Sequence, residues 1–263
     1  MNNDILIRCT GLSKAYSGTL ALDKVDLEIG RGRIIGLLGP NGSGKTTLIK
    51  ILNGLICPTG GKATIDGEEP GTYTKSIVSY LPDKSYFADW MSVRDLIELF
   101  EGFYPDFERR RAEEMCASLG IAGNQRLKEM SKGTREKMQL ILVMSRRAQL
   151  YLLDEPIAGV DPAARDFILN TIISNYNEEG TILISTHLIT DIERILDEVV
   201  FLQNGRVIRH ESVEEIRTRE GRSIDEAFRE DFRMIPQSSA EGVWKYRQQE
   251  ERSETEGGVS DDK

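Results

Sequence analysis

Short apolar runs alternate with helical patterns along most of this chain. Five runs of four to six residues show no polar alternation, which is typical of strands buried on both faces of a largely parallel sheet. These runs lie at 33–38, 76–81, 150–153, 181–185 and 198–202. Segment 20–30 alternates apolar with polar residues and segment 63–69 carries an Asp-Gly turn, so both predict antiparallel strands beside the main sheet. The pattern predicts an α/β fold with a mainly parallel sheet core and an antiparallel β subdomain.

The strand pattern is absent from residues 82–149. Ser92 and Asp95 have the spacing of a capping box before an apolar helix face, and 106–119 predicts a second helix that ends at a glycine. This part of the chain is therefore expected to form an α-helical insertion at about 84–149.

The last part of the fold is predicted to be small. A turn sequence is followed by a short strand at 206–210 and by a helix from Ser212. These elements complete a domain that spans 1–235. Residues 236–263 lose periodicity and become polar, so a flexible C-terminal tail is expected there.

The composition is that of a soluble globular protein. Of the 263 residues 39% are hydrophobic, and no apolar run approaches the roughly 18 to 20 residues that cross a bilayer. The N-terminus lacks the layout of a signal peptide, and three scattered cysteines are too few for a disulfide or zinc framework. A cytoplasmic protein is expected, whose role at a membrane would come through a partner. The net charge of −9 argues against nucleic acid as a main partner.

A phosphate-binding loop is predicted between the first buried strand and the helix that follows it. The sequence GPNGSGKT at 39–46 matches G-x-x-x-x-G-K-[ST], in which backbone N–H groups surround phosphates, the lysine reaches the β- and γ-phosphates, and the last hydroxyl binds Mg²⁺. The nucleotide-binding candidates are Gly39, Pro40, Asn41, Gly42, Ser43, Gly44, Lys45, Thr46 and Thr47, and Thr46 is also a candidate ligand of Mg²⁺. The alternative is a glycine-rich turn that only joins strand to helix, but such a turn would not need the Gly-Lys-Thr end.

Two acidic residues follow the apolar run at 150–153. Side chains at the carboxyl edge of such a sheet face the ligand crevice, where two carboxylates need a compensating cation. Asp154 is the candidate for holding Mg²⁺, and Glu155 for orienting and polarising the attacking water. An isolated pair of acids would instead be a helix cap and a surface residue. His187 follows the run at 181–185 in the same crevice and is a candidate contact of the γ-phosphate.

The helical insertion contains a helix start with an unusual charge. Lys132, Arg135 and Lys137 crowd its first turn, although unpaired N–H groups and the helix dipole favour anions at that end. Either an external negative group binds there, or the basic residues form a solvated face paired with Glu129 and Glu136.

Taken together, the phosphate loop, LYLLDEP, IAGVD and STH resemble, in order and spacing, the ATP-binding subunit of an ABC transporter. The resemblance covers residues 4 to about 232 and implies a P-loop NTPase of the ABC ATPase class, in which two subunits enclose two ATP molecules. It implies that Tyr16 stacks on the adenine, that Asp161 crosses to the second subunit, and that His187 contacts the γ-phosphate. The helical insertion would dock on a membrane-embedded permease, which places the subunit peripherally on the inner face of the cell membrane.

Within this resemblance, MSKGT at 130–134 stands where the family has its Leu-Ser-Gly-Gly-Gln signature. Ser131 and Gly133 match that signature and would bind the γ-phosphate of the ATP held by the second subunit. Lys132 and Arg135 would strengthen the contact. The missing negative group would then be supplied by the other subunit.

Asp83 is a second departure, because the family has a glutamine there that reaches the metal and couples to the permease. A carboxylate is also a hard oxygen ligand, so Asp83 is a candidate ligand of Mg²⁺, although it adds negative charge near the phosphates.

The signature variant resembles that of subunits serving small bacterial exporters. The main hypothesis is an ATPase subunit that binds ATP and Mg²⁺, pairs with a second nucleotide-binding subunit as a homodimer or heterodimer, and drives a separate exporter-type permease. An ATP-gated clamp in nucleic-acid or ribosome work is disfavoured by the single cassette and the short insertion. A weakly active ATP sensor is disfavoured because Lys45, Asp154, Glu155 and His187 are all retained.

Overall fold

The structure is a computed structural model that describes residues 4–160, 162–177 and 179–234 of the 263. It divides into two compact units, residues 1–225 and 226–263. The first unit holds both sheets. The tail predicted at 236–263 lies outside the described residues, and the domain end at 235 stays a prediction.

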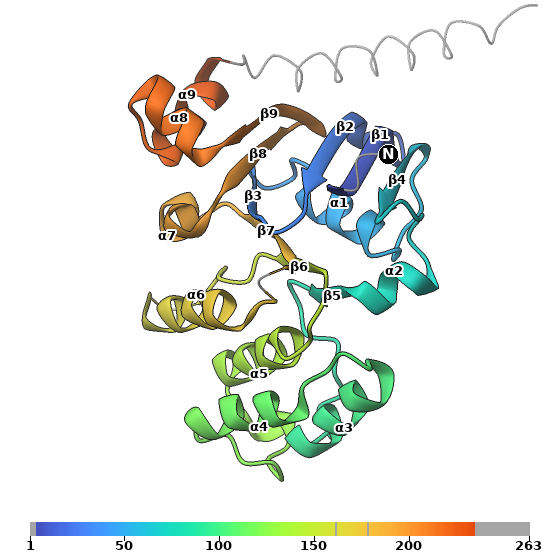
Figure 1. Ribbon diagram of the computed structural model, residues 1–263, viewed down its shortest axis with the longest axis vertical. Coiled ribbons are helices and arrows are strands. Elements are labelled where there is room, and N and C mark those ends of the chain that lie inside the picture. The colour runs from blue at the N-terminus through green and yellow to red at the C-terminus, as the bar shows by residue number, and fades with distance from the viewer. Residues whose placement is uncertain (1–3, 161, 178, 235–263) are drawn as a thin grey trace, which may run out of the picture. The chain divides into compact units, whose positions relative to one another are not determined.

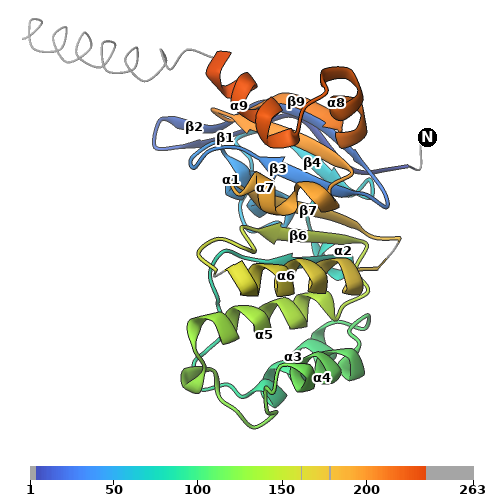
Figure 2. The same ribbon diagram turned by 90° about the vertical axis from the view of Figure 1, so that its left-hand side faces the viewer.

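A six-stranded sheet with the order β5-β6-β7-β3-β8-β9 forms the centre of the first unit (Figures 1 and 2). Its strands are β3 (Ile34–Leu38), β5 (Val78–Leu81), β6 (Leu150–Asp154), β7 (Thr181–Thr186), β8 (Glu198–Gln203) and β9 (Arg206–Ser212). All neighbouring strands are parallel except β8 and β9. The mainly parallel core is confirmed, and β3, β6 and β7 are buried along their whole length, as their unbroken apolar runs predict.

The register of the sheet brings three loops together at its carboxyl edge. Leu38 of β3 lies opposite Thr186 of β7, and Asp154 of β6 lies opposite Ser185. The phosphate loop, the two acids and the histidine therefore leave the sheet from neighbouring strand ends, where open α/β sheets bind their ligands.

A second sheet is antiparallel and has the order β2-β1-β4. Its strands are β1 (Ile5–Tyr16), β2 (Thr19–Gly30) and β4 (Gly60–Ile65). The antiparallel subdomain is confirmed, but the sequence pattern does not predict β1, because register shifts between Cys9 and Leu12 and between Leu12 and Lys14 interrupt its alternation. Buried side chains of β1 and β2 pack with those of β3, β6 and α1 in one hydrophobic core.

Two predicted strand boundaries are wrong. The strand predicted at 63–69 begins earlier, at Gly60, and ends at Ile65, where the predicted Asp-Gly turn forms with φ of +54° at Asp66 and +80° at Gly67. The strand predicted at 76–81 begins two residues later, because the apolar run starts in the last turn of α2 (Thr72–Ile77).

The helical insertion is confirmed and has its own hydrophobic core. Its helices are α3 (Val93–Phe103), α4 (Arg109–Ser118), the 3₁₀ helix η1 (Leu127–Glu129) and α5 (Lys132–Met144). The predicted capping box forms, since the Asp95 N–H donates to Ser92 Oγ at 3.2 Å and the Ser92 N–H donates to Asp95 Oδ2 at 2.8 Å. The helix predicted at 106–119 is shorter, but the chain leaves it at Gly120 as expected, with φ of +66°.

Arg146 fastens the insertion to the edge of the main sheet. Its side chain is 1% exposed, and its guanidinium donates to Asp106 and to the carbonyls of Ser76 and Val78. The same guanidinium lies 3.7 Å from the ring centroid of Tyr104. One buried cation thus joins the segment after α3, the end of α2 and the start of β5.

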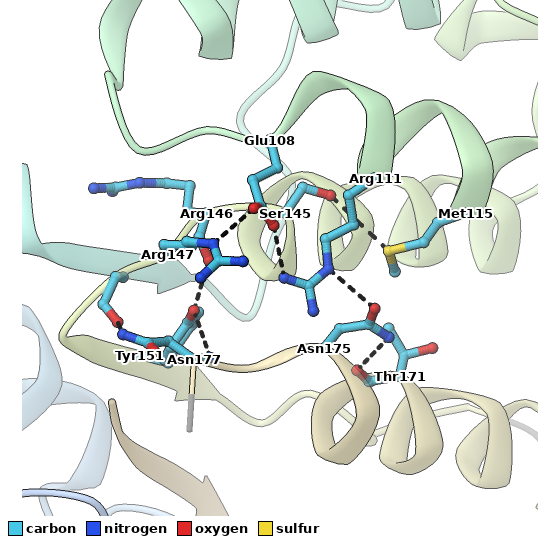
Figure 3. Close-up of polar contacts among 11 residues, drawn as sticks. Glu108, Arg111, Met115, Ser145, Arg146, Arg147, Tyr151, Thr171, Asn175 and Asn177 are labelled. Atoms are coloured by element: carbon cyan, nitrogen blue, oxygen red, sulfur yellow. Dashed lines mark hydrogen bonds and ion pairs between the residues drawn. The ribbon is translucent and has the colours of Figure 1, made fainter. Parts of the chain in front are cut away.

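A second polar attachment lies beside Arg146 (Figure 3). Glu108 accepts from Arg111 at 3.0 Å and from Arg147 at 2.6 Å, and Arg111 also donates to Asn175 at 3.2 Å. Because Asn175 is the last residue of α6, these contacts connect α4 of the insertion to a helix that covers the sheet.

The remaining helices cover the sheet or follow its last strand (Figure 2). They are α1 (Lys45–Leu52), α6 (Pro162–Asn175), α7 (Ile189–Ile192), the 3₁₀ helix η2 (Glu193–Ile195), α8 (Val213–Glu220) and α9 (Ile224–Met234). The helix predicted from Ser212 is confirmed, since Ser212 Oγ caps α8 by accepting from the Glu215 N–H at 3.1 Å. In the described part of the chain, every helix is too short or too polar to span a bilayer.

Replacing Arg146 by Met should destabilise the protein by about 2 to 4 kcal/mol, because two carbonyls and the Asp106 carboxylate lose a donor that no water can easily replace. Urea unfolding of both proteins measures the difference. Arg147→Met is the matched control, since Arg147 is 66% exposed and should leave the unfolding midpoint nearly unchanged. Equal shifts for the two variants would contradict this role of Arg146.

Candidate active site

The phosphate loop lies between β3 and α1, as predicted, and close backbone contacts require two of its glycines. A Cβ on Gly39 would lie 2.3 Å from the carbonyl oxygen of Leu202, and one on Gly44 would lie 2.4 Å from that of Ala21. Gly44 also has φ of +111°, which side-chain-bearing residues rarely adopt. The loop is therefore held tightly against β2 and β8 before any phosphate binds.

Lys45 points into this loop rather than into solvent. Its side chain is 6% exposed, and Nζ donates to the carbonyls of Gly39 at 2.8 Å and Pro40 at 3.2 Å. Nζ also lies 3.5 Å from Glu155 Oε1. Burial lowers the pKa of Lys45, while the Glu155 carboxylate acts in the opposite direction. The Lys45 ammonium group is thus already in place where the predicted phosphates would lie.

Asp154 is fully buried at the end of β6, and only one of its two carboxylate oxygens accepts hydrogen bonds from the part of the chain that the structure describes. Its Oδ1 accepts from Ser185 Oγ at 2.6 Å and from Thr46 Oγ1 at 3.1 Å, whereas Oδ2 has no hydrogen-bond partner among the described residues. Burial raises the pKa of Asp154, because the anion has lost its water. An unpaired buried carboxylate oxygen beside a hydroxyl fits a hard cation such as Mg²⁺. The sequence reasoning assigned no role to Ser185, although its place at the end of β7 indicated where it would lie.

Glu155 turns sharply away from the strand and into the crevice. Its φ is +51°, a conformation that costs a non-glycine residue about 1 to 3 kcal/mol. The Glu155 N–H donates to the carbonyl of Ser185 at 3.0 Å and thereby holds this turn. On the side chain, Oε2 lies 3.0 Å from Nδ1 of His187. The carboxylate is therefore held between a lysine and a histidine, as a residue that orients a water molecule requires.

The phosphate loop, Glu155 and His187 face a cavity of about 550 Å³, whereas the fully buried Asp154 is not part of its lining. Its lining includes the loop from Asn41 to Thr47 together with Tyr16, Asp83, Glu155 and His187. Ala21 and Ala158 also line it and were not predicted. Gly39 and Pro40 are not part of the lining, because their carbonyls point at Lys45.

Tyr16 and Asp83 line the cavity from two different elements, the end of β1 and the segment after β5. Tyr16 ends β1 and is 45% exposed, with Lys14 Nζ 5.1 Å from its ring centroid, so its face can be covered by a flat ligand. Asp83 follows β5, and its charge contributes to the raised pKa of Asp154. The carboxylate at 83 is thus part of the same electrostatic site as the predicted metal ligand.

The predicted signature residues lie elsewhere, at the start of α5, and none of them lines this cavity. Ser131 caps the helix, with its Oγ accepting from the Thr134 N–H at 3.2 Å. Lys132 lies 3.7 Å from Glu136, which confirms one pairing of the solvated-face alternative. The predicted pairing with Glu129 is wrong, because Arg135 pairs with Asp89 at 2.7 Å.

Lys137 and Gly133 complete this helix start. Lys137 Nζ lies 5.2 Å from the ring centroid of Phe167 on α6, a contact within the chain rather than with a ligand. A Cβ on Gly133 would meet nothing within 4 Å, so the backbone there is open to a partner. Asp161, predicted to cross to a second subunit, lies outside the described residues.

Asp154→Asn should stabilise the ligand-free protein at neutral pH. Because the folded pKa of Asp154 is raised above its ordinary value of 3.8, the buried anion costs stability above the folded pKa and costs nothing below 3.8, where both states bind the proton. The gain should therefore shrink as the pH falls toward 4. Urea unfolding of both proteins between pH 4 and pH 8 measures it, with Asp166→Asn on the exposed face of α6 as control. A loss of stability at pH 7, or a gain independent of pH, would contradict the burial argument.

Comparison with known proteins identifies the family to which this fold belongs. The profile of the family described as "ABC transporter" matches residues 22–158, more than half of the chain. The ABC transporter ATP-binding protein YtrB of Bacillus subtilis is 32% identical over 215 residues, which cover 81% of this chain and 74% of the relative. The daunorubicin resistance ATP-binding protein DrrA3 of Streptomyces coeruleorubidus is 28% identical, with coverage of 86% and 75%.

Solved structures agree with the fold. An ATP-binding subunit of an ABC transporter superposes with a TM-score of 0.76 at 29% identity, covering 86% of this chain and 98% of that subunit. A dimeric ATP-binding cassette bound to ADP and Pi has a TM-score of 0.69 at 20% identity, with coverage of 79% and 98%. The chain therefore belongs to the ABC transporter family, as one of its ATP-binding, ATP-hydrolysing subunits.

Proposed function

We propose that this subunit powers an exporter-type permease and hydrolyses ATP in the cavity of the phosphate loop, paired with a second ATP-binding subunit. The observation that carries the proposal is the Glu155 carboxylate, fixed between Lys45 and His187 at the carboxyl edge of the sheet. Transporter subunits among the relatives, one of them named for drug resistance, favour this function over an ATP-gated clamp.

Hydrolysis would proceed by in-line attack of water on the γ-phosphorus. Glu155 accepts a hydrogen bond from that water and polarises it, which sharpens its nucleophilicity as the bond to the β–γ bridging oxygen breaks. Lys45 would exchange the Gly39 and Pro40 carbonyls for phosphate oxygens, and ADP leaves with the negative charge that Lys45 stabilises. His187 keeps Glu155 in place through Nδ1 and leaves its other ring nitrogen for the γ-phosphate.

Mg²⁺ would be held by the Asp154 carboxylate and the Thr46 hydroxyl, with Asp83 as a further oxygen ligand. The unpartnered Oδ2 of Asp154 and the Thr46 hydroxyl hydrogen-bonded to Oδ1 support this set. When bound, the cation would neutralise charge on the β- and γ-phosphates. It would also compensate the Asp154 carboxylate, whose pKa is raised by burial and further by the charges of Asp83 and Glu155.

The start of α5 would complete the site of the second subunit. Ser131, Lys132, Gly133 and Arg135 lie outside their own cavity, and Lys132 is 81% exposed. An open glycine backbone and an exposed lysine, paired among the described residues only with Glu136 of the next turn, are suited at a helix N-terminus to a phosphate that arrives from outside the chain. Asp161 is expected to join this contact from the loop after β6. The second subunit would be a copy of this chain or a different cassette, and ATP-dependent dimerisation of the purified chain alone would show that it is a copy.

The permease is proposed to dock between the helical insertion and the main sheet, which would place the subunit peripherally on the cytoplasmic face of the membrane. A cavity of about 520 Å³ lies there, lined by Tyr80, Tyr86 and Tyr104 among others. Asp83 lines both this cavity and the nucleotide cavity. A permease segment bound there would therefore touch a residue that also faces the phosphates, which gives a short route for coupling.

Glu155→Gln tests the hydrolytic role. The amide keeps the shape of the site but cannot polarise water, so turnover should fall by about 100-fold or more while ATP affinity is kept and an ATP-bound dimer accumulates. Phosphate release, fluorescent-nucleotide binding and size-exclusion chromatography measure the three quantities. Glu98→Gln, on an exposed face of α3, should behave as wild type. Turnover by Glu155→Gln at the wild-type rate would remove Glu155 from its proposed role.

Lys132→Glu and Arg135→Glu test the contact in trans. Each reversal should weaken ATP-dependent dimerisation by about tenfold, because a negative charge then faces the phosphates of the other subunit, and should leave monomeric ATP binding unchanged. Dimerisation is measured by sedimentation in the Glu155→Gln background, with purified chain alone and no second cassette. Lys128→Glu, exposed one turn earlier in η1, is the control. Unchanged dimerisation in both variants would confine these residues to their pairs with Glu136 and Asp89.

A further inference from the structure

Arg165 bridges two segments that lead away from the active site, the loop after β6 and the helix α7 that follows His187. It lies in the first half of α6, and its Nε donates to the carbonyl oxygen of Val160 at 3.0 Å. Its Nη1 donates to Asp191 Oδ2 at 2.8 Å. Val160 belongs to the loop that begins at Glu155, and Asp191 lies in α7, four residues after His187.

The two segments are therefore tied together at two points. At the near end, His187 Nδ1 lies 3.0 Å from Glu155 Oε2. At the far end, the guanidinium of Arg165 connects Val160 to Asp191. Two separate attachments fix both the distance and the relative rotation of two segments, whereas the near contact alone would leave rotation free.

The loop from Glu155 to Val160 borders a cavity on one side, so the second attachment restrains it where packing is incomplete. A cavity of about 420 Å³ is lined by Glu155, Pro156, Ala158 and Val160 of the loop and by residues of α5 and α6. Ile157 and Val160 are buried and the Glu155 N–H is bonded to Ser185, so the hydrogen bond from Arg165 to Val160 adds a restraint at the end of the loop farthest from Glu155.

We propose that Arg165 is a positioning residue for ATP hydrolysis, which acts by holding the Glu155–His187 contact in its productive geometry. A planar guanidinium can donate to a carbonyl and to a carboxylate in fixed directions at once, which an ammonium cannot do. Displacement of a water-orienting carboxylate by about an ångström is enough to cost a large factor in rate. The inference rests on the proposed roles of Glu155 and His187.

The test compares Arg165→Ala with a matched control in the purified full chain. Arg194→Ala removes an ion pair of 3.1 Å between η2 and Asp166 of the same α6, but touches neither segment. We expect Arg165→Ala to lower kcat for ATP by about tenfold with KM changed less than twofold, and Arg194→Ala to change neither. Arg165→Lys, which can keep one of the two contacts, should recover part of kcat.

A double-substitution cycle separates positioning from a general loss of structure. In the His187→Ala background the near attachment is already absent, so adding Arg165→Ala should lower kcat by less than twofold further. Multiplicative losses, an unchanged kcat in Arg165→Ala, or equal losses in the Arg194→Ala control would each overturn the inference. None of these results touches the role of Glu155, which is decided separately by Glu155→Gln.

Discussion

Burial of charge at the carboxyl edge of the main sheet is the constraint on which the rest of the active site depends. Asp154 and Lys45 are both almost fully buried, and each would destabilise the fold if it had no partner. Ser185, Thr46 and the loop carbonyls satisfy these charges only in part, since Asp154 Oδ2 has no partner in the described chain. The incompletely paired charges therefore lower the stability of the ligand-free fold, and binding of a cation and a phosphate chain would offset this loss.

Hydrogen bonds and ion pairs between segments distant in sequence hold these buried charges in place. The strained turn at Glu155 is held by the carbonyl of Ser185, and Arg165 ties the following loop to α7. Arg146 does the same for the helical insertion by joining it to the first residues of β5, the strand that leads to Asp83. The insertion is thus connected to the nucleotide cavity through one short strand and the carboxylate that follows it.

The sequence predicted the elements of the site better than the contacts between them. The run from β3 through the phosphate loop to α1, and the ends of β6 and β7, followed from buried apolar runs and the residues after them. β1 was missed because its bulges break the alternation, and the start of β5 was misplaced because an apolar run continues from a helix into a strand. Arg165 and Arg146 could not be predicted, since their partners are carbonyls and acids brought near only by the fold. For the basic start of α5, the structure confirms that local acids pair with its side chains. The contact with a phosphate of a second subunit remains a prediction.

A crystal structure of the Glu155→Gln variant with ATP and Mg²⁺ tests most directly whether the buried charges of Lys45 and Asp154 bind the nucleotide and its cation. We expect Lys45 Nζ to leave the carbonyls of Gly39 and Pro40 for phosphate oxygens, the cation to lie beside Asp154 and Thr46, and Ser131 of a second subunit to contact the γ-phosphate. Phosphates bound away from Lys45, with Nζ still on the loop carbonyls and Asp154 Oδ2 still without a partner, would contradict the proposed site.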